Sequence, residues 1–238
     1  MGCLQHCTLV LSDSHSHLPS FYRFAAFFQK VKNTFICHCN PSQVSKNITW
    51  WKEALGSDWY ECSISIQSKP SLLSVFIDVS FGIGLLIDGQ WLAWHLLEGW
   101  KSDSCDIGWT EMVTVDLGLH TLIHSDCHDY HIAFHSDNQD IVGALKAGRS
   151  YNSTQNEIFH QIIANFYNHK IWLSVSWIKS EDNILDSISW GILPLSIACH
   201  DHPPSIPSYL KPFVTLVLPC LCFLENTHYC LFLFLFVS

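Results

Sequence analysis

The chain has 238 residues, enough for one sizeable core or for one domain of ordinary size with an appendage. Hydrophobic residues make up 48% of it and charged residues 14%, a composition that excludes a disordered chain. Its formal net charge of −9 counts against strong unaided binding to nucleic acid, which normally requires basic patches.

Composition divides the chain into three regions. Residues 1–70 carry a small basic excess, whereas residues 71–194 hold fifteen acidic and only five basic residues. Residues 195–238 begin with a stretch rich in Pro, His and Ser and end in apolar runs at 213–224 and 229–237. Each run is shorter than the roughly 20 residues of a membrane-spanning helix. We therefore expect no membrane association, and we expect residues 195–238 to lie outside the fold.

The elements can be predicted in chain order from hydrophobic periodicity and turn signals. Helices are expected at 18–32 and 47–55, followed by strands at 72–79, 82–87 and 91–96, with Asp88-Gly89 as a two-residue hairpin turn. A helix at 109–124 and a strand at 131–135 come next. The helix at 138–147 has Asn138 as its expected N-cap and Gly148 as its stop. The remaining elements are a helix at 154–168, opened by a Thr154/Glu157 capping box, a strand at 171–177 and a helix at 182–190.

This order of elements predicts an α/β fold. Three consecutive antiparallel strands followed by strands that are linked through helices form a five-stranded mixed sheet, an antiparallel meander and then parallel strands, flanked by helices.

Four acidic residues occupy informative positions in that order. They lie near the end of the first strand of the 71–194 region, in the first turn of the next helix, after the fourth strand and in the closing helix: Asp78, Glu111, Asp137 and Asp186. They are far apart in sequence, so only the fold could bring them together. Clustered carboxylates suit two Mg²⁺ ions, with Mn²⁺ as a possible substitute, which together support phosphodiester hydrolysis. The competing interpretation is that they are solvated surface acids, as most Asp and Glu are.

The residues around these acids resemble a known family. The segments are Val75-Phe-Ile-Asp-Val-Ser80 with Gly82-Ile-Gly84, Gly108-Trp-Thr-Glu-Met-Val113, His135-Ser-Asp-Asn-Gln139, Trp177-Ile-Lys-Ser-Glu-Asp-Asn183 and Asp186-Ser-Ile-Ser-Trp-Gly191. In this order they resemble the RNase H domain of gypsy-like and related fungal retrotransposon reverse transcriptase polyproteins. Residues 1–70 look like the helical segment that joins the polymerase to RNase H in such polyproteins, and the polymerase itself is missing.

The resemblance implies a ribonuclease H-like fold and an endonuclease that cleaves the RNA strand of RNA–DNA hybrids with two Mg²⁺ ions. It implies no small-molecule cofactor. Asp78, Glu111, Asp137 and Asp186 would then be the catalytic residues and the metal ligands. The residues expected to contact the nucleic acid are Ser80, Asn138, Gln139, Lys146 and Arg149. Lys146 and Arg149 also have another interpretation, as charges that stabilise a helix C-terminus through its macrodipole.

Two departures from the family pattern keep a second hypothesis open. Ser189-Trp190-Gly191 stands where the family has Ser-Arg-Gly, which removes a cation beside the predicted site, and no Asp-Asp pair of a polymerase occurs in the chain. The alternative is a catalytically inactive retroelement remnant that keeps a ribonuclease H-like fold, either without enzymatic activity or as an interaction module.

The remaining signals concern the compartment, the cysteines and the tryptophans. There is no signal-peptide pattern, so the eleven cysteines are expected to be reduced in an intracellular protein of the cytoplasm or nucleus that is not secreted. A cluster of potential zinc ligands does not match the common C-x₂-C spacing: Cys3, His6, Cys7, Cys37, His38 and Cys39. Four strand tryptophans are expected in the core rather than as base-stacking platforms: Trp91, Trp94, Trp172 and Trp177.

Overall fold

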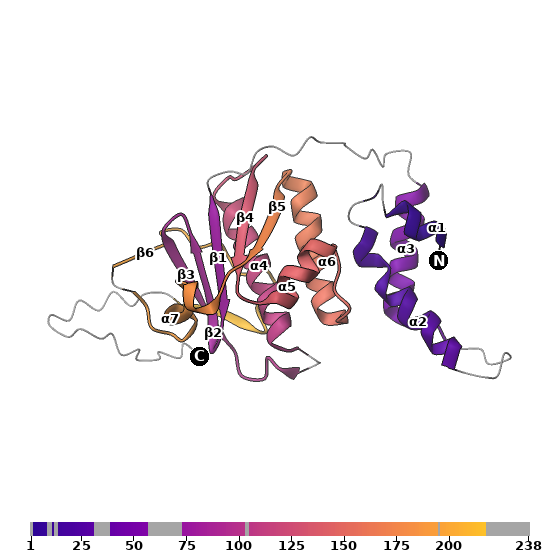
Figure 1. Cartoon of the computed structure of the whole chain (residues 1–238), viewed down its shortest axis with the longest axis horizontal. Helices are drawn as coiled ribbons and strands as arrows, with labels where there is room; N and C mark the ends of the chain where they lie inside the picture. Colours follow the sequence, from indigo (N-terminus) through magenta and orange to yellow (C-terminus); the bar gives the residue numbers. More distant parts are fainter. Residues whose placement is uncertain are drawn as a thin grey trace.

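The computed structural model describes residues 2–8, 11, 14–30, 39–56, 73–102, 105–194 and 196–217. A helical N-terminal unit precedes an α/β unit (Figure 1). The N-terminal unit consists of α1 (Gly2–Cys7), the 3₁₀ helix η1 (Ser14–His17), α2 (Pro19–Lys30) and α3 (Ser42–Gly56). Helices were predicted here at 18–32 and 47–55, and both exist, although α3 begins five residues earlier than expected.

The α/β unit is built on a mixed sheet. Its principal strands are β1 (Ser74–Val79), β2 (Gly82–Ile87), β3 (Gln90–Leu96), β4 (His131–Ser136) and β5 (Trp172–Trp177), in the spatial order β5-β4-β1-β2-β3. β1, β2 and β3 pair antiparallel, whereas β4 pairs parallel with β1 and β5 pairs parallel with β4. The predicted α/β class, with a meander followed by parallel strands, is therefore confirmed.

The meander turns where the sequence predicted it. Ile87 pairs with Gln90 across the two-residue loop, and Asp88 and Gly89 have φ values of 49° and 74°. Positive φ at both central residues is the conformation of the type I′ turn, whose twist matches that of the flanking strands.

Helix α4 (Ile107–His124) lies closely against the sheet. Its N-cap is Asp106, whose carboxylate accepts a hydrogen bond of 2.7 Å from the Trp109 amide. Gly118 lets the helix approach, because a Cβ at this position would lie 3.1 Å from atoms of Leu85 and Phe134. The sequence thus sets both the start of α4 and its distance from the sheet.

Two further helices cover the same unit. Asn138 is the N-cap of α5 (Gln139–Ala147), and Gly148 ends this helix in the left-handed conformation, as predicted. α6 (Ser153–His169), however, is capped by Asn152, whose side chain accepts from the amides of Thr154 and Gln155. The predicted capping box is therefore wrong, and Thr154 lies within the helix.

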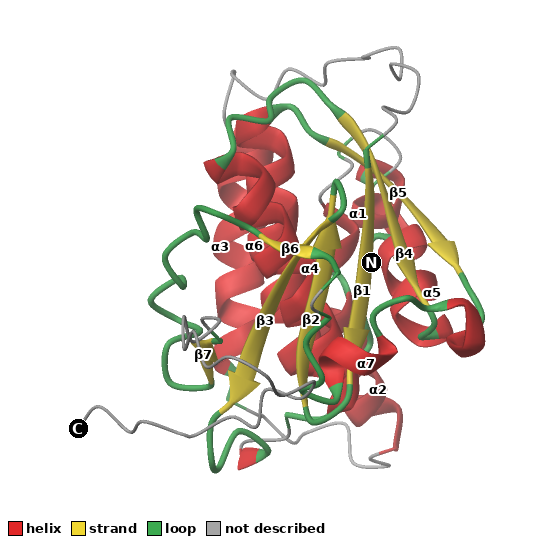
Figure 2. Ribbon diagram, turned by 90° about the vertical axis from the view of Figure 1, so that its left-hand side faces the viewer, coloured by secondary structure: helices red, strands yellow, loops and turns green. Residues whose placement is uncertain are grey.

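The two faces of the sheet are covered by different helices. Val75, Ile77, Ile83 and Leu85 belong to the main core together with residues of α4 and α6. Alternate residues such as Leu86 and Ala93 point to the other face, where Leu185 and Ile188 cover them. Ile188 belongs to α7 (Asp186–Ser189), which lies in front of the sheet in Figure 2 with α4 and α6 behind it. The predicted closing helix at 182–190 is thus shorter than expected, and the 3₁₀ helix η3 (Ser180–Asp182) precedes it.

The expectation that residues 195–238 lie outside the fold is wrong for residues 196–217. Within them, β6 (Ala198–Cys199) pairs parallel with β3 and β7 (Val214–Leu216) pairs antiparallel with β3, so the described sheet has seven strands rather than five. Leu210 and Val214 are buried in the main core, with exposed fractions of 0% and 2%. Most of the two predicted apolar runs lies outside the described residues.

A buried polar contact also ties this segment to α4. The Tyr209 hydroxyl donates a hydrogen bond of 2.5 Å to Oδ2 of Asp116, which is fully buried. Burial raises the pKa of Asp116 to about 7, and the hydrogen bond from Tyr209 partly opposes this shift. Residues 196–217 are therefore attached by strand pairing, apolar packing and a hydrogen bond.

The N-terminal unit has a small core of its own and contacts α6. Leu11, Leu18, Trp51 and Ala54 are buried together. The ring of His17 stacks between those of Trp50 and His160, at centroid distances of 3.9 and 4.1 Å. In addition, the Asn156 side chain donates to the Ser16 carbonyl. The unit thus lies beside α6, as Figure 1 shows.

No helix in the described residues combines the length and the apolar character that crossing a membrane requires. Cys3, Cys7 and Cys39, considered above as zinc ligands, carry free thiols, and Cys37 and His38 lie outside the described residues.

The corrected boundary can be tested with Leu210→Ala. This change removes a fully buried side chain and should lower the free energy of unfolding by about 2–5 kcal/mol. Leu55→Ala, at a site that is 56% exposed, is the matched control and should change it by less than about 0.5 kcal/mol. Urea denaturation measures both, and an equal effect of the two variants would show that residues 196–217 are not part of the core.

Candidate functional site

The four predicted acids come from four different elements. Asp78 is the fifth residue of β1, Asp137 directly follows β4, Glu111 lies near the start of α4, and Asp186 is the first residue of α7. β1 and β4 are parallel neighbours in which Phe76 is paired with His135. Asp78 and Asp137, each two residues further along, therefore lie side by side at the same edge of the sheet.

Electrostatic interactions link the four groups. The carboxyl of Asp78 interacts with those of Asp137 and Asp186, and the carboxyl of Glu111 interacts with those of Asp78 and Asp137. The structure therefore brings together acids that are separated by up to 108 positions in the sequence.

Glycines in β2 let α7 approach this edge. Asp78 pairs with Gly84, and a Cβ on Gly84 would lie 3.4 Å from both Ile188 Cγ2 and the Ser189 amide. At Gly82, a Cβ would lie only 2.8 Å from the Trp94 carbonyl oxygen, closer than real Cβ contacts allow. Gly84 thus leaves the space in which α7 carries Asp186 to the site, whereas Gly82 allows the close approach of the neighbouring strand β3.

Asn183 positions Asp78, although it was not among the predicted site residues. It is 5% exposed, and its Nδ2 donates to Asp78 Oδ1 at 3.0 Å and to the Ile77 carbonyl at 3.2 Å. Its Oδ1 accepts from the Leu185 amide just before α7. Asn183 therefore connects β1 to the helix that bears Asp186. It stands in the motif that carried the family resemblance, which was the available signal.

The environment of Asp78 favours its neutral form. Burial raises its pKa to about 6, and the charges of Asp137 and Asp186 act in the same direction. Hydrogen bonds from the Ser189 side chain and the Val79 amide oppose the shift without cancelling it.

The pKa of Glu111 is raised further than that of Asp78. This residue is only 3% exposed, and burial, followed by the charges of Asp78 and Asp137, raises its pKa to about 8. The side chain of Asn138 hydrogen-bonds it and works against the shift. Oε2 of Glu111 is buried without a hydrogen-bond partner in the described part of the chain. A buried, unsatisfied carboxylate oxygen among other acids is costly for folding and points to an external partner.

The chemistry of these groups fits a divalent cation. Carboxylate oxygens are the hard ligands that Mg²⁺ prefers, and a cation would offset the repulsion and the cost of burial. In the described ranges, no three His, Cys, Asp or Glu side chains are arranged to hold one ion as they stand. Binding would therefore require the carboxyl groups to adjust their rotamers around the ion.

The residues predicted to contact nucleic acid separate into two groups. Ser80 follows β1, Asn138 contacts Glu111, and Gln139 is exposed at the start of α5. Lys146 lies in the last turn of α5, and Arg149 lies beyond that turn with its guanidinium over the Tyr151 ring. The structure thus groups the first three with the acids and places the two cations at the opposite end of α5.

Two tryptophans donate hydrogen bonds at the site. Trp177 is 45% exposed, and its Nε1 donates to the Asp137 carbonyl at 2.9 Å, so its predicted place in the core is wrong. It is the last residue of β5, where the sheet no longer covers it. Trp190 Nε1 donates to Asp186 Oδ1 at 3.2 Å. Trp91 and Trp94 are buried as predicted, and Trp172 is half-buried.

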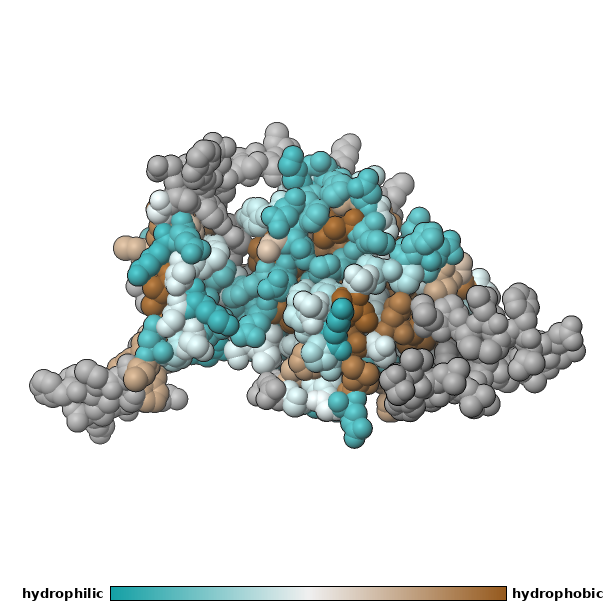
Figure 3. All heavy atoms as spheres, turned by 180° about the vertical axis from the view of Figure 1, so that it is seen from behind, coloured by the Kyte–Doolittle hydropathy of each residue, from teal (hydrophilic) through white to brown (hydrophobic). Residues whose placement is uncertain are grey.

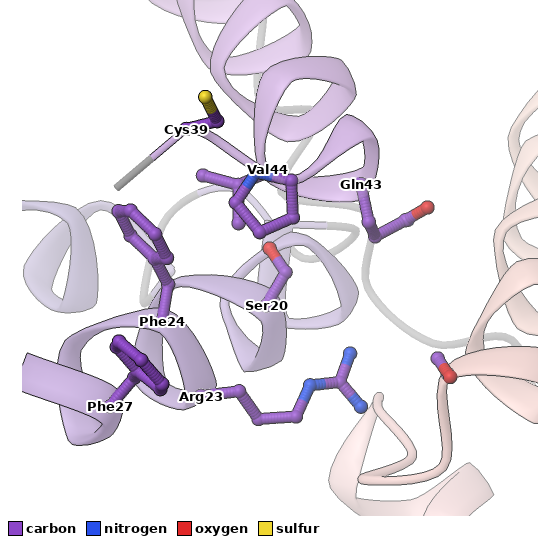
Figure 4. Close-up of a pocket in the computed structure, with 9 residues that line it drawn as sticks. Ser20, Arg23, Phe24, Phe27, Cys39, Gln43 and Val44 are labelled. Atoms are coloured by element: carbon purple, nitrogen blue, oxygen red, sulfur yellow. The ribbon is translucent and has the colours of Figure 1, made fainter. Parts of the chain in front are cut away.

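Two cavities lie away from the acids. One of about 530 Å³ is lined by residues of α2 and α3, by Cys39 and Pro41 just before α3, and by Ser153. Figure 4 shows Phe24 and Phe27 projecting from α2 there, and Arg23 reaching toward the neighbouring segment, where it donates to the Tyr151 carbonyl at 2.7 Å. The other, of about 960 Å³, lies between α5, α6 and β5. On the side of the molecule seen in Figure 3, hydrophobic residues show in separate patches between hydrophilic ones.

The raised pKa of Glu111 predicts a stabilising substitution. In the folded chain the pKa of Glu111 is about 8, against an ordinary 4.5. The free energy of unfolding is therefore unaffected by ionisation of Glu111 below pH 4.5 and falls as the pH rises from 4.5 to 8. Glu111→Gln removes this loss. The variant should match the parent chain near pH 4.5 and exceed it increasingly toward pH 8, by up to about 1.4 kcal/mol per pH unit.

Urea denaturation in EDTA at both pH values measures this difference. Glu181→Gln is the control, because Glu181 is exposed and should give no pH-dependent gain. If Glu111→Gln were equally or less stable than the parent chain at pH 8, the carboxyl of Glu111 would not be held in a desolvated, repelling environment.

Comparison with protein-family models and with curated proteins found no match to this chain. The observation to be explained is a set of four acids from four elements, two of which have strongly raised pKa values at one edge of the sheet.

Proposed function

We propose that the α/β unit is a ribonuclease H-like domain and that the chain is an RNase H-type endonuclease, a fragment of a retrotransposon polyprotein that cleaves the RNA strand of RNA–DNA hybrids. The observation that carries this proposal is the meeting of Asp78, Glu111, Asp137 and Asp186 at one sheet edge. The motifs that resemble retrotransposon RNase H domains contain these same four residues.

The topology supports the proposal. An antiparallel meander, two further parallel strands and a short helix on the opposite face give the arrangement that the resemblance implies. The acids then fall at the carboxyl ends of β1 and β4 and near the starts of α4 and α7, and the electrostatic interactions among them link these four positions.

The four carboxylates would hold two Mg²⁺ ions. When bound, such an ion pair activates the attacking water and stabilises the leaving oxygen of a phosphodiester. The chain's own residues prepare this site: Asn183 orients the carboxylate of Asp78, and Asn138 contacts that of Glu111. Selection of RNA would depend on groove shape and on contacts with 2′-hydroxyl groups.

The alternative is a catalytically inactive remnant with the same fold, or an interaction module. It is favoured by Trp190, which stands where the family has arginine, and by the low number of basic residues in the α/β unit. Both proposals require the same fold, and cleavage activity separates them.

Asp137→Asn tests the proposal. Using the full chain, Mg²⁺ and a hybrid with end-labelled RNA, we expect the parent chain to cleave the RNA strand and Asp137→Asn to fall to the level of the control without protein. The amide keeps the shape of the carboxylate but removes the charge that offsets Mg²⁺. Thermal melting without Mg²⁺ should show no loss of stability, because one repelling charge is removed.

Asp140→Asn is the matched control. It makes the same chemical change three residues away, at an exposed position in the first turn of α5, and should leave cleavage intact. Full activity of Asp137→Asn would contradict the proposed site. A folded parent chain without activity would favour the inactive alternative.

A further inference from the structure

Two exposed aromatic side chains lie next to the carboxyl groups. Phe81 follows Ser80 in the turn between β1 and β2, three residues after Asp78, and Trp190 directly follows α7, four residues after Asp186. Their ring centroids are 4.9 Å apart with an interplanar angle of 61°. The exposed fractions are 69% for Phe81 and 52% for Trp190, so most of this apolar area faces solvent beside the site.

The structure fixes the position of the pair. The indole of Trp190 is tied to Asp186 by its hydrogen bond to Oδ1, and Gly191, with φ of 82°, turns the chain directly after it. Phe81 precedes Gly82, which packs against the Trp94 carbonyl more closely than any larger residue could. A rigid aromatic pair loses little conformational entropy when a ligand binds.

The charges near the site make stacking the more suitable means of holding a nucleic acid. Cations strengthen phosphate contacts, but the two that were predicted to make them, Lys146 and Arg149, lie at the opposite end of α5. Lys179, two residues beyond β5, is paired with Glu181 at 3.3 Å. Stacking of a base on an aromatic ring does not depend on charge and accepts every base. Within a duplex, neighbouring bases cover one another and only their edges face the grooves. Away from the ends of a duplex, an exposed ring can therefore take the face of a base only where the base is unpaired.

We propose that Phe81 and Trp190 form a stacking platform for an unpaired nucleobase of a strand that leaves the hybrid beside the carboxyl groups. This inference rests on the proposed function, because it takes a nucleic acid as the ligand. It makes Trp190 a specificity-determining residue: the chain prefers hybrids with a single-stranded extension to blunt hybrids.

The test measures binding by fluorescence anisotropy in EDTA, where cleavage cannot occur. Three labelled ligands are compared: a blunt RNA–DNA hybrid, the same hybrid with a short single-stranded extension, and that extension made of abasic nucleotides. The parent chain should bind the extended hybrid about tenfold more tightly than either of the others, because only this ligand offers a base that can stack on the rings.

The variants separate the ring from its N–H group. Trp190→Leu and Phe81→Leu should remove the preference, whereas Trp190→Phe, which keeps a ring but loses the donor to Asp186, should retain part of it. Tyr130→Leu is the control. Tyr130 is 46% exposed just before β4, at the end of the sheet opposite the acids, and its replacement should leave the preference unchanged.

Three binding results would overturn the platform. Equal binding of the base-containing and abasic extensions would exclude base stacking, and so would an unchanged preference in Trp190→Leu. Failure of the parent chain to bind any of the three ligands would also overturn it. Lack of cleavage in Mg²⁺ with the preference intact would contradict the nuclease proposal alone.

Discussion

The desolvation of two buried carboxyl groups, Asp78 and Glu111, with repulsion from the acids beside them, is the constraint on which the rest of this structure depends. Burying Glu111 and Asp78 near two further acids costs folding free energy, which is why burial and like charge raise their pKa values to about 8 and 6. The core on both faces of the sheet must outweigh this cost. Gly84 admits α7 against the sheet, and Gly118 admits α4 against Phe134, so the packing that stabilises the fold also brings the acids together.

Strong local signals made most of the fold predictable from the sequence. The hairpin turn at Asp88-Gly89, the N-cap Asn138 and the helix stop Gly148 each depend only on residues close by in the sequence. The structure has all three as expected. Pairing with β3 forms β6 and β7, whose two and three residues are too few to show a periodicity. The start of α6 was missed because Asn152 and Thr154 can both cap a helix, and Asn152 gains a contact with Asp106 that only the fold supplies.

The sequence was sufficient to predict which four acids form the candidate site, but not whether their carboxyl groups are protonated. The order of elements selected the four acids, but protonation depends on burial, which no local pattern reports. The same holds for the aromatic residues: Trp177 and Trp94 both occupy strands, yet only Trp94 lies between the sheet and a helix. For Trp190, the sequence indicated only the loss of a cation, whereas the structure adds a donor to Asp186 and an exposed ring.

The central claim is that these carboxyl groups form a cation site, and the proton balance of Mg²⁺ binding tests it most directly. With a pKa of about 8, Glu111 carries a proton at neutral pH and must release it to become a ligand. Titration calorimetry at pH 7 in two buffers of different ionisation enthalpy should therefore show Mg²⁺ binding accompanied by proton release, and Glu111→Gln should abolish that release. Absence of Mg²⁺ binding, or binding without proton release, would contradict the account.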